Sequence, residues 1–178
     1  MKRLSFWQAV PLTAALVLGI LVGCQPPPPP PETAKPVELN DVTIAELNGI
    51  IAGHRGKVVL IDVWFLGCAP CVKRFPKFVE LHRELQADGL ICITLDTYRE
   101  ELKKKDSVLE FLKQQGADTQ NLIVDDREAT QDAWQLQYDA LATPSYVIFD
   151  RNGKWVPTPA PEDKENMARI LRKLLAEK

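Results

Sequence analysis

The chain has 178 residues, of which 46% are hydrophobic and 26% charged, and its formal net charge is −2. This length predicts one folded domain with an additional segment, and the composition is that of a globular protein. The near-neutral charge without a basic stripe argues against nucleic-acid binding, and four cysteines are too few for a disulfide-scaffolded domain.

The chain begins with a segment typical of export. Met1-Lys2-Arg3 is a short positive start, and residues 9–23 are apolar apart from Thr13. This run is shorter than the roughly 20 residues that a membrane-spanning helix needs, so it predicts a signal peptide. An uncleaved anchor, or an ordinary cleaved signal followed by an incidental cysteine, is the alternative.

The signal segment ends in Leu21-Val22-Gly23-Cys24, which resembles the lipobox of bacterial lipoproteins. The resemblance implies a signal peptide over residues 1–23 and a lipid on Cys24 that attaches the chain to a membrane. Residues 24–36 include six consecutive prolines, which favour an extended polyproline II conformation. We therefore expect a tether here, with a proline-rich ligand for a partner protein as the competing interpretation.

The first half of the expected domain, which spans residues 37–178, contains two strands and two helices. Residues 40–53 are expected to form an edge strand and a short helix. Residues 57–64 are a nearly continuous apolar run, which is typical of a buried central strand. A helix is expected over residues 69–87, interrupted by Pro76 and ending near Gly89.

Strands and helices continue to alternate in the second half, which indicates an α/β domain. The expected elements are a strand at 90–95, a helix at 107–115 that stops at Gly116, a strand at 122–124, a helix at 128–137, a strand at 145–149, a tight turn at Asn152-Gly153, an extended segment at 154–156 and a last amphipathic helix around residues 167–175.

Cys68 and Cys71 form a CxxC pair between the buried strand and the following helix. Two intervening residues on a first helical turn bring the sulfurs within bonding reach and leave the first one exposed at the helix N-terminus. Free backbone N–H groups and the positive end of the helix dipole stabilise a thiolate there, and the thiolate is the attacking species in disulfide exchange. The pattern predicts a redox-active dithiol.

Half of a zinc site is the alternative interpretation of the CxxC pair. Such a site needs two further ligands, and only Cys92, His54 and His82 remain. Cys92 lies within an expected buried strand, where a cysteine usually acts as a small hydrophobic residue. We therefore expect no metal.

The segment VVLIDVWFLGCAPCVKRFP resembles the active-site stretch of thioredoxin-like proteins, especially the periplasmic TlpA/ResA-type thiol–disulfide oxidoreductases. Asp62 matches the buried acid of the family, Trp64 the aromatic residue that follows it, and Pro76 the helix-kinking proline. Pro144 in ATPS matches the cis-proline that faces the CxxC pair. The stretch YVIFDRNGK and a long helical insertion at about residues 97–120 resemble the TlpA/ResA subfamily.

Two positions depart from the family pattern. The residue before the first cysteine is usually tryptophan, whereas this chain has Gly67, which removes an aromatic wall beside the nucleophile. Many TlpA/ResA-type members have a non-acidic residue at the position of Asp62, so this aspartate is closer to thioredoxin itself.

The resemblance implies a thioredoxin fold, with a central mixed sheet flanked by helices, and a thiol–disulfide oxidoreductase. Cys68 would be the nucleophile, Cys71 the resolving cysteine, and Asp62 the base that takes the proton of Cys71 through water. No cofactor is expected beyond the Cys68–Cys71 disulfide. The residues expected at the substrate-binding surface are Trp64, which would serve as a packing wall, with Ala69, Pro70, Thr143 and Pro144.

The resemblance further implies a monomer in the bacterial cell envelope, anchored through Cys24 and facing the extracytoplasmic space. Its partners would be proteins with disulfides, in cytochrome c maturation or in repair of oxidised envelope proteins, and a membrane electron donor of the CcdA/DsbD type. A disulfide oxidase or isomerase is the first alternative, because Ala69-Pro70 does not fix the direction of electron flow. A copper-binding assembly chaperone of the same fold is the second, although such proteins use CxxxC with a histidine.

Overall fold

The computed structural model describes residues 35–126, 128–157 and 163–177. The signal peptide, Cys24 and all of the tether except Lys35 and Pro36 lie outside the described residues. The elements in chain order are β1 (Asn40–Val42), α1 (Ile44–Gly53), β2 (Val58–Trp64), α2 (Ala69–Leu85), the 3-10 helix η1 (Gln86–Asp88), β3 (Leu90–Asp96), the 3-10 helix η2 (Arg99–Lys104), α3 (Lys105–Gln115), β4 (Gln120–Val124), α4 (Glu128–Gln137), β5 (Ser145–Phe149), β6 (Trp155–Val156) and α5 (Lys164–Ala176).

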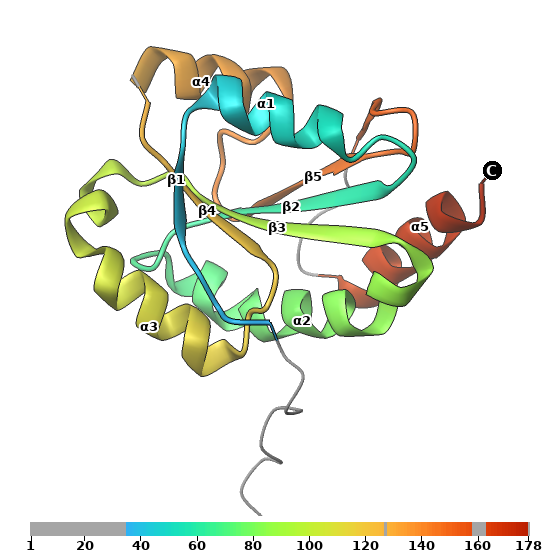
Figure 1. Ribbon diagram of the computed structural model, residues 1–178, viewed down its shortest axis with the longest axis horizontal. Helices are drawn as coiled ribbons and strands as arrows, with labels where there is room; N and C mark the ends of the chain where they lie inside the picture. Colours follow the sequence, from blue (N-terminus) through green and yellow to red (C-terminus); the bar gives the residue numbers. More distant parts are fainter. Residues whose placement is uncertain (1–34, 127, 158–162, 178) are drawn as a thin grey trace, which may run out of the picture.

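The strands form one mixed sheet in the order β1-β4-β3-β2-β5-β6. The first four strands in this order are parallel, whereas β5 is antiparallel to β2 and β6 is antiparallel to β5. Helices α1 and α4 cover one face, and α2, α3 and α5 cover the other (Figure 1). The predicted thioredoxin-type α/β architecture, with a mixed sheet between helical layers, is confirmed.

Strand β2 lies at the centre of the sheet, and every one of its residues is buried. Because side chains alternate along a strand, the residues of β2 divide between two cores. Val59, Ile61 and Val63 pack with α1 and α4, while Leu60 and Trp64 pack with α2, α3 and α5. Asp62 shares the parity of Leu60 and Trp64, so it faces the layer that contains the CxxC helix.

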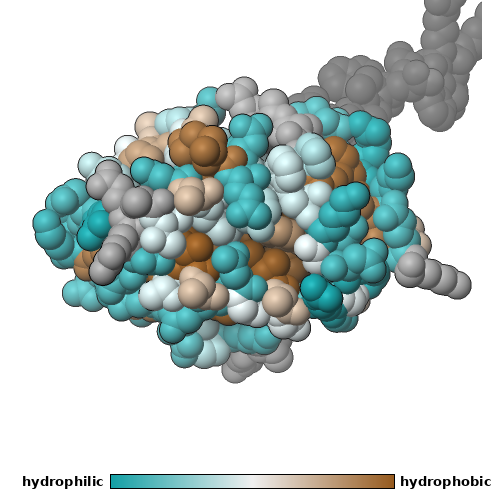
Figure 2. Space-filling model, turned by 90° about the horizontal axis from the view of Figure 1, so that it is seen from above, coloured by the Kyte–Doolittle hydropathy of each residue, from teal (hydrophilic) through white to brown (hydrophobic). Residues whose placement is uncertain are grey.

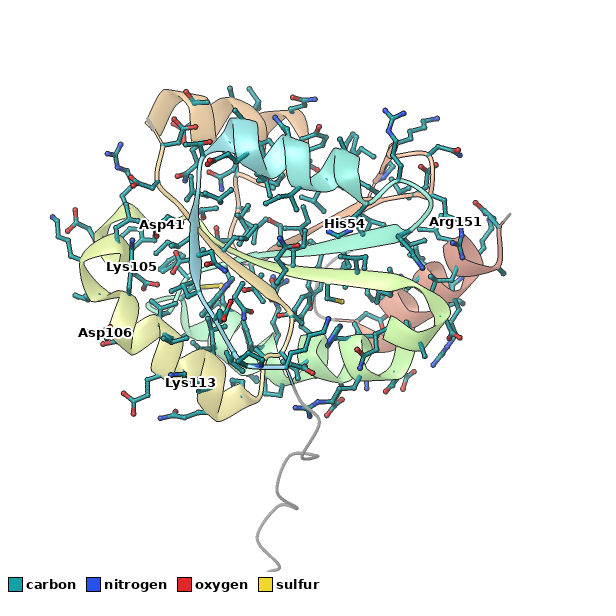
Figure 3. The ribbon with its side chains drawn as sticks, viewed as in Figure 1. Asp41, His54, Lys105, Asp106, Lys113 and Arg151 are labelled. Atoms are coloured by element: carbon teal, nitrogen blue, oxygen red, sulfur yellow. A yellow bond between two sulfur atoms is a disulfide. The ribbon has the colours of Figure 1, made fainter. Side chains whose placement is uncertain are left out.

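The expected helical insertion forms η2 and α3, and the chain then returns through β4 between β3 and β1. Gly116 ends α3 with a φ of 60°, as the sequence predicts. Asn121 fixes this region from inside, because its amide donates to the carbonyls of Glu38 and Ala117, each at 3.0 Å, and accepts from Thr94 at 2.9 Å. Lys105 pairs with Asp41 of the edge strand, and Figure 3 shows the two side chains beside one another.

The predicted turn at Asn152-Gly153 joins β5 to β6, and Gly153 has a φ of 75°. Arg151, labelled in Figure 3, donates to the carbonyls of Gly56 and Leu175, each at 2.7 Å. These bonds tie the turn to the loop before β2 and to α5. The sequence places each described element correctly, with differences of about two residues at the start of α3 and β4.

The face over α1 and α4 is mostly hydrophilic, with small separate hydrophobic patches (Figure 2). The large hydrophobic side chains that are exposed among the described residues are Tyr98, Leu136 and Leu141. No helix in the described ranges has both the length and the apolar composition needed to cross a membrane.

Candidate active site

Cys68 and Cys71 are joined by a disulfide at the start of α2, with their Cα atoms 5.2 Å apart. Cys68 is the N-cap residue of the helix, and its Sγ accepts a hydrogen bond from the Cys71 N–H at 3.3 Å. Pro70 lies in the first helical turn, where a missing N–H leaves no helical hydrogen bond unmade. The spacing therefore produces the helix-tip pair that the sequence predicts.

The two cysteines are less accessible than the sequence analysis expects. Cys71 has no exposed surface, and Cys68, expected to be exposed, is only 6% exposed. Both belong to the core cluster under α2, against which the half-buried Phe65 and Leu66 also pack. The residues on either side of Cys68, Gly67 and Ala69, and the following Pro70 are exposed.

Asp62 is completely buried on β2 and pairs with Arg74 of α2. Arg74 lies one helical turn after Cys71 and is itself only 6% exposed. Its Nη2 donates to Asp62 Oδ1 and also to the carbonyls of Val63 at 3.4 Å and Ser145 at 3.0 Å. The sequence analysis finds the carboxylate but not its cationic partner.

Burial raises the pKa of Asp62 from its ordinary 3.8 to about 6, because a carboxylate loses hydration in the core. The charge of Arg74 and its hydrogen bond act in the opposite direction and limit the rise. A carboxyl with such a pKa is mostly ionised at neutral pH and can still accept a proton, which suits a general base.

The peptide bond between Thr143 and Pro144 is cis, in agreement with the prediction. Pro144 and Pro70 line one cavity of about 290 Å³ together with Lys73, Arg74 and Lys77. The fold thus brings the proline loop before β5 next to the first turn of α2, although 74 residues separate the two prolines in the chain.

Trp64 has no exposed surface. Its ring packs against Phe75 of α2 at a centroid distance of 4.7 Å and against Phe111 of α3 at 5.3 Å. A side chain enclosed in this way cannot contact a substrate, so its place among the substrate-binding residues is wrong. The packing role expected for it is what the structure shows.

A second carboxylate holds the loop that leads to Cys68. Glu101 of η2 is 6% exposed and accepts hydrogen bonds from the N–H groups of Leu66 at 2.8 Å and Gly67 at 2.9 Å. Burial, followed by the hydrogen bond with Glu101, raises the pKa of the neighbouring Asp96 to about 9. The raised pKa favours the neutral form of the Asp96 carboxyl, while both carboxylate oxygens of Glu101 accept from the loop.

Sequence reasoning missed Arg74 and Glu101 for different reasons. Arg74 follows Cys71 by three residues and precedes Phe75 and Phe78, so helical spacing alone could have placed it on the buried face. Glu101 stands in the charged run REELKKK, where nothing in the pattern distinguishes the one buried acid from its exposed neighbours.

Cys92 is a free thiol buried on β3, as expected, and burial raises its pKa well above 9.0. Within the described part of the chain, no three histidine, cysteine or acidic side chains gather closely enough to share a metal ion.

Comparison with solved structures finds the same fold at low sequence identity. A thiol:disulfide interchange protein of the thioredoxin family from Chlorobium tepidum is 18% identical, with a TM-score of 0.59 over 70% of this chain and 84% of that one. The thioredoxin domain of a thiol-disulfide oxidoreductase from Bacteroides vulgatus is 20% identical, with a TM-score of 0.57 over 70% and 83%. A secreted Mycobacterium tuberculosis disulfide oxidoreductase, described as homologous to E. coli DsbE, is 14% identical, with a TM-score of 0.52 over 68% and 85%.

The family model for Redoxin matches residues 38–175, which is nearly the whole expected domain and includes both cysteines and the cis-proline. The solved structures share the thioredoxin-type fold of this chain, and the family model shows that the chain belongs to the Redoxin family.

Proposed function

We propose that this protein reduces disulfides of envelope proteins outside the cytoplasm, with Cys68 and Cys71 as its redox centre and no further cofactor. The observation that carries the proposal is the Cys68–Cys71 disulfide at the tip of α2, in the same structure as a cis-proline loop and a buried carboxylate with a pKa of about 6. Each part supplies one requirement of disulfide exchange: an electrophile or nucleophile, a substrate contact and a proton acceptor.

The cycle transfers two electrons from the reduced pair to the substrate. The Cys68 thiolate attacks a substrate disulfide, so that a mixed disulfide forms and one substrate sulfur leaves as a thiolate. Cys71 then attacks Cys68 Sγ, which re-forms the Cys68–Cys71 disulfide and releases the second substrate sulfur. Asp62 takes the proton that Cys71 loses, through a water molecule.

The substrate surface consists of Ala69 and Pro70 on α2 and of Thr143 and Pro144 in the opposing loop. Ala69 and Pro70 are exposed, and Thr143 and Pro144 are half-buried. An extended substrate segment would pair with the backbone of Thr143 as an added strand does, with its cysteine held over Cys68. Such a surface suits a monomer that acts on protein disulfides.

The proposed location follows from the N-terminal sequence. A lipid on Cys24 and the proline-rich tether would hold the domain at an envelope membrane, where an electron donor of the CcdA/DsbD type could reduce it again. The Mycobacterium tuberculosis structure is described as a secreted oxidoreductase homologous to DsbE, which supports an extracytoplasmic role. The process served would be cytochrome c maturation or repair of oxidised envelope proteins.

The reduction potential of the Cys68–Cys71 couple, measured against glutathione, tests the proposed direction. We expect a value near that of thioredoxin, about −270 mV, whereas a value near about −120 mV would identify an oxidase instead. Cys68→Ser is the control, because it must abolish the two-electron equilibrium. Disulfide exchange that persists in Cys68→Ser, or a wild-type Cys68 that alkylates like a free solution thiol, would contradict the proposal.

A further inference from the structure

Arg74 connects three parts of the site through one guanidinium group. It extends from α2 one helical turn after Cys71, and its Nη2 contacts Asp62 on β2, the Val63 carbonyl beside it and the Ser145 carbonyl on β5. The guanidinium carbon lies 4.1 Å from the centre of the Tyr146 ring, so a cation–π contact holds its plane. A planar group fixed in this way has little freedom to move away from Asp62.

The pairing leaves the two oxygens of Asp62 in different situations. Oδ1 accepts from Arg74, whereas Oδ2 is buried and has no hydrogen-bond partner within the described residues. An isolated buried carboxylate would be driven to its neutral form, and a cation beside one oxygen opposes that. The carboxylate is thereby kept ionised, and its second oxygen can receive a proton.

The other end of the contact reaches the substrate loop. Ser145 follows the cis-proline directly, and its carbonyl accepts from Arg74 at 3.0 Å. Arg74 also lines the cavity of about 290 Å³ between Pro70 and Pro144. A shift of the guanidinium would therefore change the wall of this cavity and also remove the hydrogen-bond donor of Asp62.

We propose that Arg74 is a positioning residue that keeps Asp62 available as a proton acceptor and at the same time fixes the Pro144 loop against α2. This inference rests on the proposed function and extends it, because it makes proton transfer and substrate contact depend on one side chain. Lysine could supply the charge but not the planar guanidinium that lies against the Tyr146 ring while its Nη2 reaches the Ser145 carbonyl.

The titratable groups around Asp62 determine what a pH profile would report. They are Arg74 and Cys71 on α2, Cys92 on β3 and Tyr146, which pairs with Asp62 in the sheet register, on β5. Burial raises the pKa of Cys92 well above 9.0 and that of Tyr146 above its ordinary value, so both remain neutral between pH 5 and pH 9. An acidic limb in that range therefore combines ionisation of the Cys68 thiol, which attacks only as a thiolate, with ionisation of Asp62, and the Asp62→Asn background separates the two.

The experiment uses the full chain in a peptide-disulfide reduction assay between about pH 5 and pH 9, with Arg74→Met, Arg74→Lys and Asp62→Asn. In Arg74→Met the acidic limb of kcat/KM should move upward by about 1 to 3 pH units, because the cation next to Asp62 is lost. KM should rise by roughly 2- to 10-fold, because the Ser145 carbonyl loses its donor. Arg74→Lys should keep the limb near its wild-type position and still raise KM.

Two comparisons make the test specific. In an Asp62→Asn background, Arg74→Met should no longer shift the limb, because its effect passes through the carboxylate. Arg83→Met removes an arginine from the exposed side of the same helix, which among the described residues donates to the Gly116 carbonyl at 3.1 Å, and should change neither the limb nor KM. An unshifted limb in folded Arg74→Met, or an unchanged KM in Arg74→Lys, would overturn the corresponding half of the proposal.

If Arg74→Met does not fold, the Asp62 carboxyl can be titrated by ¹³C NMR in Arg74→Lys and in the wild type. The Arg74 proposal requires the Asp62 pKa in Arg74→Lys to lie close to the wild-type value, and a clear shift in either direction would overturn it. If the wild type reduces no disulfide at any pH, the proposed function fails, whereas the influence of Arg74 on Asp62 is still read from this titration.

Discussion

Asp62 is an acid that the alternation of β2 turns toward α2, in a strand where all seven residues are buried. Its position within VVLIDVW was sufficient to predict burial, because neither face of a central strand reaches solvent. Helical spacing could have placed Arg74 on the buried face of α2, but its pairing with Asp62 was not predictable, because that contact joins two different elements. The pKa of Asp62 is therefore set by two opposing causes: burial raises it, and the neighbouring Arg74 cation lowers it.

The raised pKa of Asp62 predicts an unusual pH dependence of stability. The folded state binds the proton more tightly than the unfolded state, because its pKa is about 6 and the ordinary value is 3.8. Asp62 therefore contributes most to the free energy of unfolding below pH 3.8, its ordinary pKa, and this contribution is lost as the pH rises through the folded-state pKa of about 6. Between these two pH values the free energy of unfolding of the wild type should fall by up to about 3 kcal/mol relative to that of Asp62→Asn.

Urea denaturation of the oxidised protein between about pH 4 and pH 7 measures this difference. Asp88→Asn, which removes an exposed carboxylate from η1, controls for the loss of one negative charge. A free-energy difference between wild type and Asp62→Asn that does not change with pH would show that Asp62 has the same pKa in both states.

At the scale of elements, two segments from distant parts of the chain position the cysteine loop. Helix α2 provides the N-cap geometry of Cys68, and η2 provides Glu101, which binds the N–H groups of Leu66 and Gly67. The order of elements and the insertion were predictable from hydrophobic periodicity and turn residues. The contact between the insertion and the loop was not, because it depends on how η2 folds back over the end of β2.

Glu101→Gln should loosen this loop. One amide oxygen cannot replace two carboxylate oxygens, so the N–H of Leu66 or of Gly67 loses a charged acceptor, and a hydrogen bond to a charged group contributes about 1.5 to 3 kcal/mol. We expect this loss in urea denaturation of the oxidised protein, together with faster alkylation of Cys68 in the reduced protein.

The matched control is Glu100→Gln. Glu100 is the preceding residue, is exposed and forms a surface pair with Lys103 at 3.1 Å. Its substitution should therefore change the free energy of unfolding by no more than about 0.5 kcal/mol. Equal effects of the two substitutions would refute a specific role for Glu101.

At the scale of the whole molecule, a sheet covered on both faces is preceded by a segment that predicts export and lipidation. The described domain starts near residue 35 with the edge strand β1 close behind, so an anchor on Cys24 would act through a short tether. The six prolines allow an extended chain of about 3.1 Å per residue, which would keep the disulfide away from the membrane surface.

Cys24→Ala should abolish incorporation of radiolabelled palmitate and release the protein from the membrane fraction, because several acyl chains are needed for stable anchoring. Cys92→Ala removes a cysteine that is buried in β3 and should leave labelling and fractionation unchanged. Membrane attachment that survives Cys24→Ala would favour an uncleaved anchor instead.

The order of strands and helices, the CxxC pair on a helix tip and the buried position of Asp62 follow from the amino-acid pattern alone. These are local properties, because periodicity and residue spacing act within one element or between neighbours. Three contacts depend instead on how the folded chain packs. Arg74 pairs with Asp62, and Glu101 binds the loop before Cys68. Trp64 packs against the rings of Phe75 and Phe111. Each of these joins different elements, and which side chains meet there depends on how the layers pack.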